Sequence, residues 1–207
     1  MGNNIYNETY FERRKKNEAL YYFLALKLNS VIKRASDVKI LEIGCGKAEF
    51  VSYLFEKSFF SSKTHKVILS DLVPQRVKYP FIEKFEIIDA EKTIPYNNEF
   101  DLILAIDVIE HIANYKSLIT NIHSALKNDG VFFFTTPNVD SFKKFIFGRK
   151  WCGYEDTTHI ILHDKFILKR VLLSYFKEVS IYGFTQIKQF ILQHQVLCDY
   201  LLGICRK

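Results

Sequence analysis

Residues able to bind a small polar ligand come directly after several apolar segments of the chain. They are Glu42 with the turn Gly44-Cys45-Gly46, then Asp71, Asp89 and Ala90. Glycines let the backbone turn sharply and approach a ligand closely. Asp71 is spaced to accept both hydrogen bonds of a ribose diol. Glu42 and the Asp89-Ala90 pair indicate a ligand with a cationic end and an adenine ring.

A nicotinamide dinucleotide site is one alternative for such a glycine turn. Its Gly-x-Gly-x-x-Gly fingerprint leaves the N-terminus of a helix clear for a pyrophosphate. Counted from Gly44, the sixth position here is Glu49, whose carboxylate would stand where the phosphate charge belongs. The sequence therefore disfavours a dinucleotide.

Short apolar segments alternate with segments of helical periodicity along the chain, and residues 137–160 receive no assignment. Helices are expected near residues 15–34, 48–57, 115–126 and 164–176. Strands are expected at residues 38–43, 66–70, 85–88, 100–106, 131–135, 178–182 and 200–205. This alternation is typical of an α/β fold with a parallel sheet covered on both faces. Ligands of such sheets bind beyond the carboxyl ends of the strands, where the polar residues fall.

Ordered motifs make residues 37–137 similar to class I S-adenosylmethionine-dependent methyltransferases. The matching segments are Leu41 to Ala48 (first motif), Ser70-Asp71-Leu72 (ribose-binding acid), Asp89 to Lys92 with Phe100 to Ile103 (adenine segment and fourth strand), Asp107 to Ile112 (motif after that strand) and Leu126 to Gly130 (turn before the fifth strand). Ala48 departs from the pattern, because many members have a third glycine there.

The resemblance implies a Rossmann-like α/β fold with a seven-stranded, mostly parallel sheet, helices on both faces and an antiparallel last strand. It implies S-adenosyl-L-methionine as the cofactor. By this resemblance, Gly44, Cys45 and Gly46 would lie along the methionine part of the cofactor, and Glu42 would support their loop. Asp71 would bind the ribose, Leu72 would pack on the adenine face, and Asp89 and the Ala90 amide would bind the adenine edge. The Ile106-Asp107 backbone would contact the methionine amine, and Arg13 or Arg14 would contact the methionine carboxylate.

Methyl transfer requires alignment of nucleophile and methyl group and exclusion of water. A hydroxyl acceptor also needs a base to remove its proton, and histidine is suited to that task. His111 and His159 are the candidate catalytic residues; the alternative is that they are structural. His163 is a weaker candidate, expected to start the next helix.

A metal site is left open. Asp107, Glu110 and His111 are spaced i, i+3, i+4, so one helical turn would bring them onto one face. Similar residues are linked to a divalent metal in ubiquinone-type O-methyltransferases. The alternative is a set of helix caps and ion pairs.

Aromatic and basic residues alternate after the fifth predicted strand, where the family builds its acceptor pocket. They are Phe142, Lys143, Lys144, Phe145, Phe147, Arg149, Lys150, Trp151 and Tyr154. This mixture favours a small acceptor with negative charge, such as a nucleotide-linked sugar or natural-product intermediate, methylated on a hydroxyl. The alternatives are N-methylation, an RNA or protein acceptor, and a binding protein without catalysis.

Composition fits one domain of 207 residues with 48% hydrophobic residues and a net charge of +6. Residues 1–36 and 137–207 are basic, and residues 37–136 are acidic. We interpret these as a helical lid, an acceptor-side segment with closing strands, and the cofactor-binding core. No membrane span or secretory signal is found, and the four cysteines form no Cys-x-x-Cys pair, so a cytoplasmic location is expected. Nucleic acid is disfavoured as a partner, and the oligomeric state is left open.

Overall fold

A single mixed β-sheet organises the chain. The computed structural model describes residues 17–32, 37–75, 77, 79–187, 190–194 and 198–207. Within them, eight strands form the sheet in the order β3-β2-β1-β4-β5-β8-β6-β7. Their bounds are β1 Val38–Ile43, β2 His65–Asp71, β3 Ile82–Ile87, β4 Phe100–Ile106, β5 Leu126–Pro137, β6 Glu178–Ile187, β7 Phe190–Gln193 and β8 Tyr200–Arg206.

Strand direction agrees with the predicted α/β class. Strands β1 to β5 pair in parallel, while β8 is antiparallel to both β5 and β6. The mostly parallel, Rossmann-like sheet and its antiparallel last strand are confirmed. The predicted number of seven strands is wrong, because β7 forms a hairpin with β6 through pairs such as Phe184 with Gln193. The side chains of β7 are largely exposed, so no buried apolar pattern marked it in the sequence.

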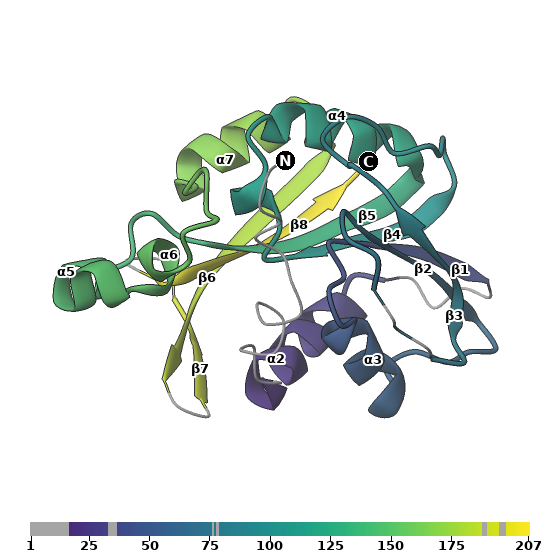
Figure 1. Ribbon diagram of the computed structural model, residues 1–207, viewed down its shortest axis with the longest axis horizontal. Helices are drawn as coiled ribbons and strands as arrows, with labels where there is room; N and C mark the ends of the chain where they lie inside the picture. Colours follow the sequence, from purple (N-terminus) through teal and green to yellow (C-terminus); the bar gives the residue numbers. More distant parts are fainter. Residues whose placement is uncertain (1–16, 33–36, 76, 78, 188–189, 195–197) are drawn as a thin grey trace.

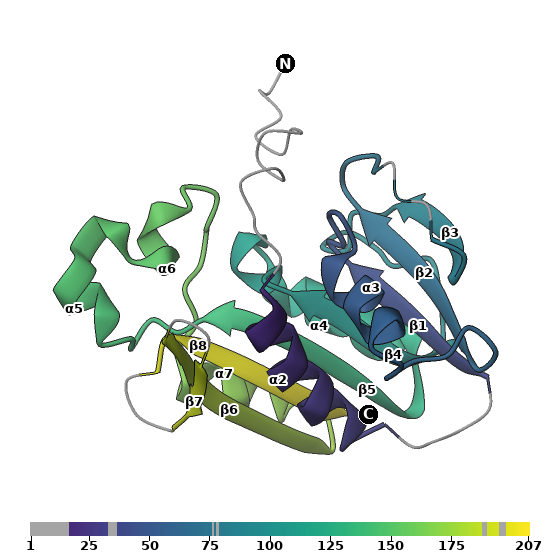
Figure 2. The ribbon, with the colours of Figure 1, turned by 90° about the horizontal axis from the view of Figure 1, so that it is seen from below.

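Helices cover both faces of the sheet. Helices α2 (Glu18–Asn29) and α3 (Glu49–Glu56) lie on one face, and α4 (Tyr115–Ala125) and α7 (Lys165–Leu172) lie on the other (Figure 1). Figure 2, seen from below, shows α2 and α3 in front of the sheet. The described part contains no helix long and apolar enough to cross a membrane.

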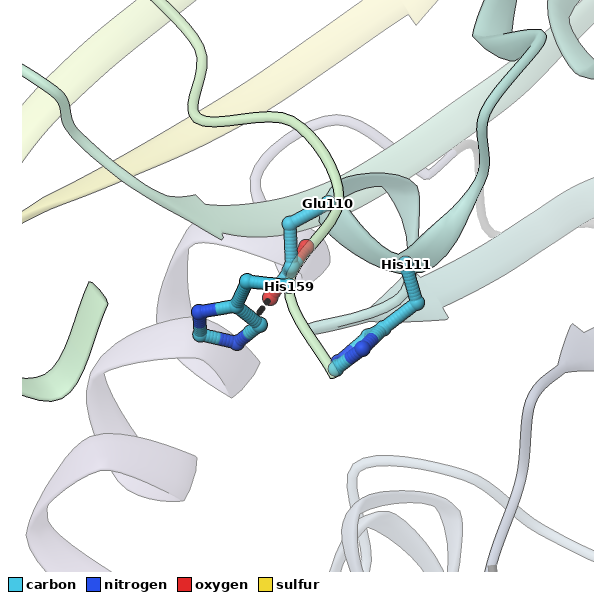
Figure 3. A group of neighbouring side chains, drawn as sticks. All are labelled: Glu110, His111 and His159. Atoms are coloured by element: carbon cyan, nitrogen blue, oxygen red, sulfur yellow. Dashed lines mark ion pairs between the residues drawn. The ribbon is translucent and has the colours of Figure 1, made fainter. Parts of the chain in front are cut away.

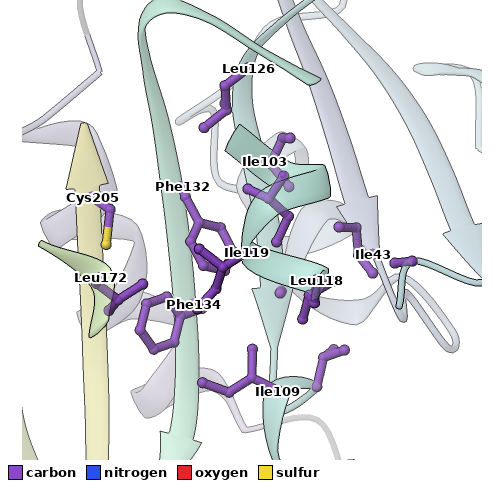
Figure 4. Packing of buried hydrophobic residues seen from close by; sticks show 14 of the residues in the cluster. Ile43, Ile103, Ile109, Leu118, Ile119, Leu126, Phe132, Phe134, Leu172 and Cys205 are labelled. Carbon is purple, nitrogen blue, oxygen red and sulfur yellow. The ribbon is translucent and has the colours of Figure 1, made fainter. Parts of the chain in front are cut away.

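Consecutive phenylalanines of β5 fill both faces of the core. Phe132 and Phe134 pack in the cluster under α4 and α7 (Figure 4), whereas Phe133 packs in the cluster under α2 and α3. Successive side chains of a strand point to opposite faces. A continuous apolar strand therefore needs helices on both sides, which explains why β5 shows no alternation with polar residues.

Residues 137–160, which the sequence left unassigned, leave the sheet as short helical turns. They contain α5 (Lys143–Phe147), the 3-10 turn η2 (Gly148–Lys150) and α6 (Cys152–Glu155). Figures 1 and 2 both place α5 at the end of the molecule opposite β3. The other predicted segments overlap the observed elements, with ends that differ by up to five residues; the strands at 38–43 and 100–106 match β1 and β4 at both ends.

Candidate functional site

The glycine turn after β1 has a backbone that restricts which residues can occupy it. Gly44 and Gly46 have φ angles of +62° and +48°. A Cβ at Gly44 would lie 2.7 Å from Cγ2 of the Val108 side chain, and the positive φ is one that other residues rarely adopt, so both features favour glycine there. Ala48 also lies in the left-handed region, with φ +56°, directly before α3. The turn thus keeps the left-handed conformation even where the third glycine of the family pattern is replaced.

Asp71, at the end of β2, is joined to the glycine turn. Its carboxylate accepts hydrogen bonds from the amides of Gly46 at 2.9 Å and Val73 at 3.2 Å. The side chain is buried, with 9% exposure. Since β1 and β2 are parallel neighbours, their carboxyl ends meet, and Asp71 is held against the turn.

Glu42 is a buried acid beside these two features. It is 3% exposed, and its Oε2 accepts no hydrogen bond within the described part of the chain. Burial, with the nearby charge of Asp71, raises the pKa of Glu42 to about 8. A buried carboxyl with an unsatisfied oxygen is costly unless a cation or donor faces it. This arrangement fits a ligand with a positively charged end.

Cys45 does not have the environment of a nucleophile. Its thiol is buried and lies 3.6 Å from the carbonyl oxygen of Gly46. Burial raises the pKa of the thiol, which therefore stays protonated. Cys45 packs in the core beneath the turn.

Asp107, after β4, is bound to β5. Its amide donates to the carbonyl oxygen of Thr135 at 3.3 Å and to Oγ1 of the same residue at 3.1 Å. Oγ1 of Thr135 in turn donates to Oδ1 of Asp107 at 2.7 Å. A ligand ammonium placed after Ile106 donates hydrogen bonds, so its partners there would be carbonyl or carboxylate oxygens.

The predicted adenine-binding residues lie at the ends of β2 and β3. Leu72 is 51% exposed beside Asp71. Asp89 pairs with the Lys92 ammonium at 2.7 Å, and Lys92 lowers the pKa of Asp89. Ala90 is buried, and its carbonyl oxygen accepts from Nδ2 of Asn121 at 2.9 Å. Arg13 and Arg14, the predicted carboxylate-binding residues, lie outside the described residues.

A contact that the sequence did not indicate connects α2 with the start of α3. The Tyr21 hydroxyl donates to Oε2 of Glu49, the first residue of α3, at 2.8 Å. Burial, followed by this bond and the charges of Glu49, Asp107 and Glu42, raises the pKa of Tyr21. Helix α2 therefore places a phenol among the same acids that the strand ends bring together. No motif marked Tyr21, since a tyrosine at this spacing also fits a helix core.

Two histidines predicted to be catalytic lie against each other. His111 belongs to the 3-10 turn η1 (Ile109–His111), and His159 follows α6. Their ring centroids are 4.8 Å apart, and Nε2 of His159 lies 3.9 Å from Oε1 of the buried Glu110 (Figure 3). The amides of Ile160 and Ile161 both donate to the Glu110 carbonyl oxygen, at 2.8 and 3.0 Å. These bonds fix the distant segment against η1.

The hydrogen-bond partners of the two rings determine their tautomers. Nδ1 of His111 lies 3.2 Å from the carbonyl oxygen of Thr158 and 2.9 Å from its Oγ1. A carbonyl only accepts, and the Thr158 hydroxyl donates to Oδ1 of Asp156 at 2.5 Å, so His111 carries its proton on Nδ1. Likewise, Nδ1 of His159 donates to the Gly153 carbonyl at 2.9 Å. In the neutral form of each ring, Nε2 is therefore the basic nitrogen.

The same cluster has the composition of a metal site. One ligand atom each from Glu110, His111 and His159 can be chosen so that all lie within 4.8 Å of one another. One carboxylate and two imidazoles suit a divalent transition metal. The set differs from the one expected from the sequence, because Asp107 bonds to Thr135 and His159 comes from a distant segment.

His163, the third histidine considered from the sequence, is structural. It is 4% exposed, forms a bridge with Asn138, and lies 3.4 Å from the Ile109 carbonyl oxygen through Nε2. Burial lowers its pKa to about 4, so the ring is neutral at physiological pH.

The aromatic residues that the sequence assigns to the acceptor side differ in burial. Trp151 is 2% exposed and packs edge-on against Tyr154 at 4.9 Å. Phe142, Phe145 and Phe147 are instead 52%, 72% and 52% exposed. Because residues 142–150 fold as short turns beyond the sheet, only part of this segment is packed into the molecule.

Comparison of the sequence with known proteins finds methyltransferases. Residues 10–175 match the family described as a methyltransferase domain. (S)-Coclaurine N-methyltransferase from Papaver somniferum is 32% identical over 98 residues, covering 45% of this chain and 28% of that enzyme. This chain therefore aligns with less than a third of the length of that curated relative.

Solved structures share the fold along most of the chain. A SAM-dependent methyltransferase from Archaeoglobus fulgidus superposes with a TM-score of 0.70 at 18% identity, covering 99% of this chain and 100% of that one. The 1,6-didemethyltoxoflavin-N1-methyltransferase of Burkholderia thailandensis, solved with 1,6-didemethyltoxoflavin and S-adenosylhomocysteine, gives 0.62 at 15% identity, with 97% and 81% covered. At these identities the superpositions establish a common fold.

Proposed function

The chain belongs to the class I S-adenosylmethionine-dependent methyltransferases, and we propose that it methylates a hydroxyl group of a small-molecule acceptor. The observation that supports this best is the His111–His159 pair, in which Nδ1 of both rings is held and Nε2 is basic. A base beside the carboxyl edge of the sheet is what a hydroxyl acceptor needs.

The cofactor would be held by the strand ends on the side of β1 and β2. S-Adenosylmethionine supplies, when bound, a methyl group already activated on a sulfonium. We assign its cationic end to the surroundings of Glu42, whose buried Oε2 accepts no hydrogen bond in the described chain. We assign the ribose to Asp71 and the adenine to Leu72, Asp89 and Ala90. The Asp71 carboxylate would then accept hydrogen bonds both from the ribose hydroxyls and from the amides of Gly46 and Val73.

His111 is our candidate for the general base. Nε2 takes the proton of the acceptor hydroxyl, and the ring becomes an imidazolium. Asp156 stabilises this charge through the Thr158 hydroxyl, which accepts from Nδ1. His159, held at Gly153, lies near the carboxylates of Glu110 and Asp156, each 3.9 Å from its Nε2, and would position the acceptor.

N-Methylation is the second candidate reaction. The plant relative named above is an N-methyltransferase. An amine in its free-base form already carries the attacking lone pair, so it depends less on a protein base than a hydroxyl does. Substitution of His111 therefore separates the two reactions.

We further propose that the acceptor carries negative charge and is not a nucleic acid. The support is the net charge of +6 with basic flanks around an acidic core. Lys143 does not contribute, because it pairs with Asp199 at 2.6 Å. Competition by small anionic analogues, measured against generic RNA at several salt concentrations, tests both parts, since binding to RNA phosphates falls steeply with salt.

A methyl-transfer screen tests the central proposal. Purified protein with radiolabelled S-adenosylmethionine is offered small molecules bearing hydroxyl groups, small molecules bearing amines, and RNA. We expect turnover of a hydroxyl acceptor that falls about 100-fold or more in His111→Asn. The control, His123→Asn on α4, keeps full turnover. Turnover of amines alone, unchanged in His111→Asn, would favour N-methylation.

A further inference from the structure

Helix α5 exposes apolar side chains in an unusual way. Phe145, Ile146 and Phe147 follow one another and are 72%, 61% and 52% exposed, and Phe142 before them is 52% exposed. No residue of α5 is buried. Domains in water rarely expose three consecutive large apolar residues unless they bind something there.

Cations surround these side chains. Lys143 and Lys144 precede them, Arg149 and Lys150 follow, and residues 141–151 contain no acidic side chain. Arg149 and Lys150 are exposed. We call residues 142–150 the basic apolar tip.

The tip stands at one end of the molecule next to a second exposed apolar segment. Figures 1 and 2 both show α5 at the end opposite β3. Nζ of Lys143 donates to the carbonyl oxygen of Gln186 at 3.0 Å, which joins the start of the tip to the β6–β7 hairpin. In that hairpin, Ile187, Phe190 and Leu192 are 49%, 73% and 52% exposed.

We propose that the basic apolar tip docks on the surface of an anionic lipid bilayer. Exposed aromatic and aliphatic side chains would enter the interface, and the flanking cations would face acidic headgroups, as in interfacial membrane-binding segments. The charge of the segment fits this occupant: Lys143 pairs with Asp199, and the other three ionised groups, Lys144, Arg149 and Lys150, are all positive.

The geometry of the tip favours a fluid partner over a second protein. Consecutive residues of a helix project about 100° apart, so one flat protein surface cannot cover Phe145, Ile146 and Phe147 together. A bilayer can surround the end of a short helix.

Vesicle co-sedimentation of the full chain tests the proposal. We expect binding to phosphatidylcholine vesicles that contain phosphatidylglycerol, weaker binding without it, and a decrease as salt is raised. The variant Ile146→Ser should lower the partition coefficient several-fold, and Phe145→Ser/Ile146→Ser should lower it by about tenfold or more. The matched control is Ile87→Ser at the end of β3, where an isoleucine of similar exposure, 64%, lies at the opposite end of the sheet.

A second pair of variants tests the charges. Arg149→Gln/Lys150→Gln should weaken binding to anionic vesicles by about tenfold, whereas Lys63→Gln/Lys66→Gln, the same change of charge before and in β2, should not. Binding of S-adenosylhomocysteine by each variant, followed by calorimetry, reports that the fold is intact. Equal partition with and without phosphatidylglycerol, or equal partition of the tip variants and controls, would overturn the proposal. So would a dimer in light scattering that the tip variants dissociate, because the tip would then be an interface between copies of the chain.

Discussion

Oγ1 of Thr158 accepts a hydrogen bond from Nδ1 of His111 over 2.9 Å. The direction of this bond is fixed from both sides, because the same hydroxyl donates to Asp156 and the Thr158 carbonyl also faces Nδ1. The two residues are 47 positions apart in the chain. This hydrogen bond fixes the tautomer and the orientation of the His111 ring, and a general base requires both.

We predict that Thr158→Val lowers kcat for a hydroxyl acceptor by about 10- to 100-fold, because the link from His111 to Asp156 is lost. Cofactor affinity should stay unchanged, since Thr158 lies on the acceptor side of our assignment. Steady-state kinetics with calorimetry of S-adenosylhomocysteine separates the two effects. Thr158→Ser, which keeps the hydroxyl, is the matched control and should retain most of the activity. If the valine variant keeps its kcat, Thr158 does not position the base.

We predict that Asp71→Asn weakens binding of S-adenosylhomocysteine by about tenfold or more, since hydrogen bonds to a charged group each contribute about 1.5–3 kcal/mol. The change keeps the shape of a side chain that is 9% exposed, so the fold should persist. Isothermal calorimetry measures the loss, and Glu83→Gln on β3 serves as a control of equal charge change. Equal affinities in the variant and the wild type would remove Asp71 from the cofactor site.

We predict a pH-dependent stability difference between the wild type and Glu42→Gln. The pKa of Glu42 is raised in the fold from 4.5 to about 8, so the folded protein binds more protons than the unfolded chain between these values. Stability from this group is present below pH 4.5 and is lost as the pH rises through about 8. Glutamine does not ionise and avoids this loss.

Denaturant titrations of both proteins measure this effect. Well above the folded pKa of Glu42, Glu42→Gln should be more stable than the wild type by about 2 kcal/mol or more, whereas below pH 4.5 the two should be alike. The same variant should bind S-adenosylmethionine more weakly at the higher pH, where the wild type offers a carboxylate. A constant stability difference across the range would contradict an uncharged, buried Glu42.

We predict that removal of metal by a chelator shows whether Glu110, His111 and His159 hold a divalent metal that methyl transfer needs. If the cluster binds a metal, dialysis against a chelator lowers methyl transfer, and Zn²⁺ or Mn²⁺ restores it. Elemental analysis of His159→Ala should then show less bound metal than the wild type. If the histidines act as base and positioning group without a metal, chelation leaves kcat unchanged and no stoichiometric metal copurifies.

That the residues we assign to the cofactor meet at one edge of the sheet could be predicted from the sequence. Glu42, Gly44 and Asp71 lie at the ends of predicted strands, and parallel strands bring their carboxyl ends to one edge. The acceptor side could not be predicted in the same way. His159 comes from a segment without a helical or strand period, and its place beside His111 depends on bonds from the amides of Ile160 and Ile161 to the Glu110 carbonyl.

By itself, the sequence determined the α/β class and the chain order of seven of the eight strands, because periodicity and turn residues are local properties, and its ordered motifs indicated the family. Tertiary structure alone decided which distant groups meet. It placed Tyr21 on Glu49, joined Asp156 and Thr158 to His111, added β7 as a strand with little apolar pattern, and left Phe145 in solvent. The reason is physical: these contacts depend on how helices and loops pack around a finished sheet, and spacing along the chain does not encode that packing.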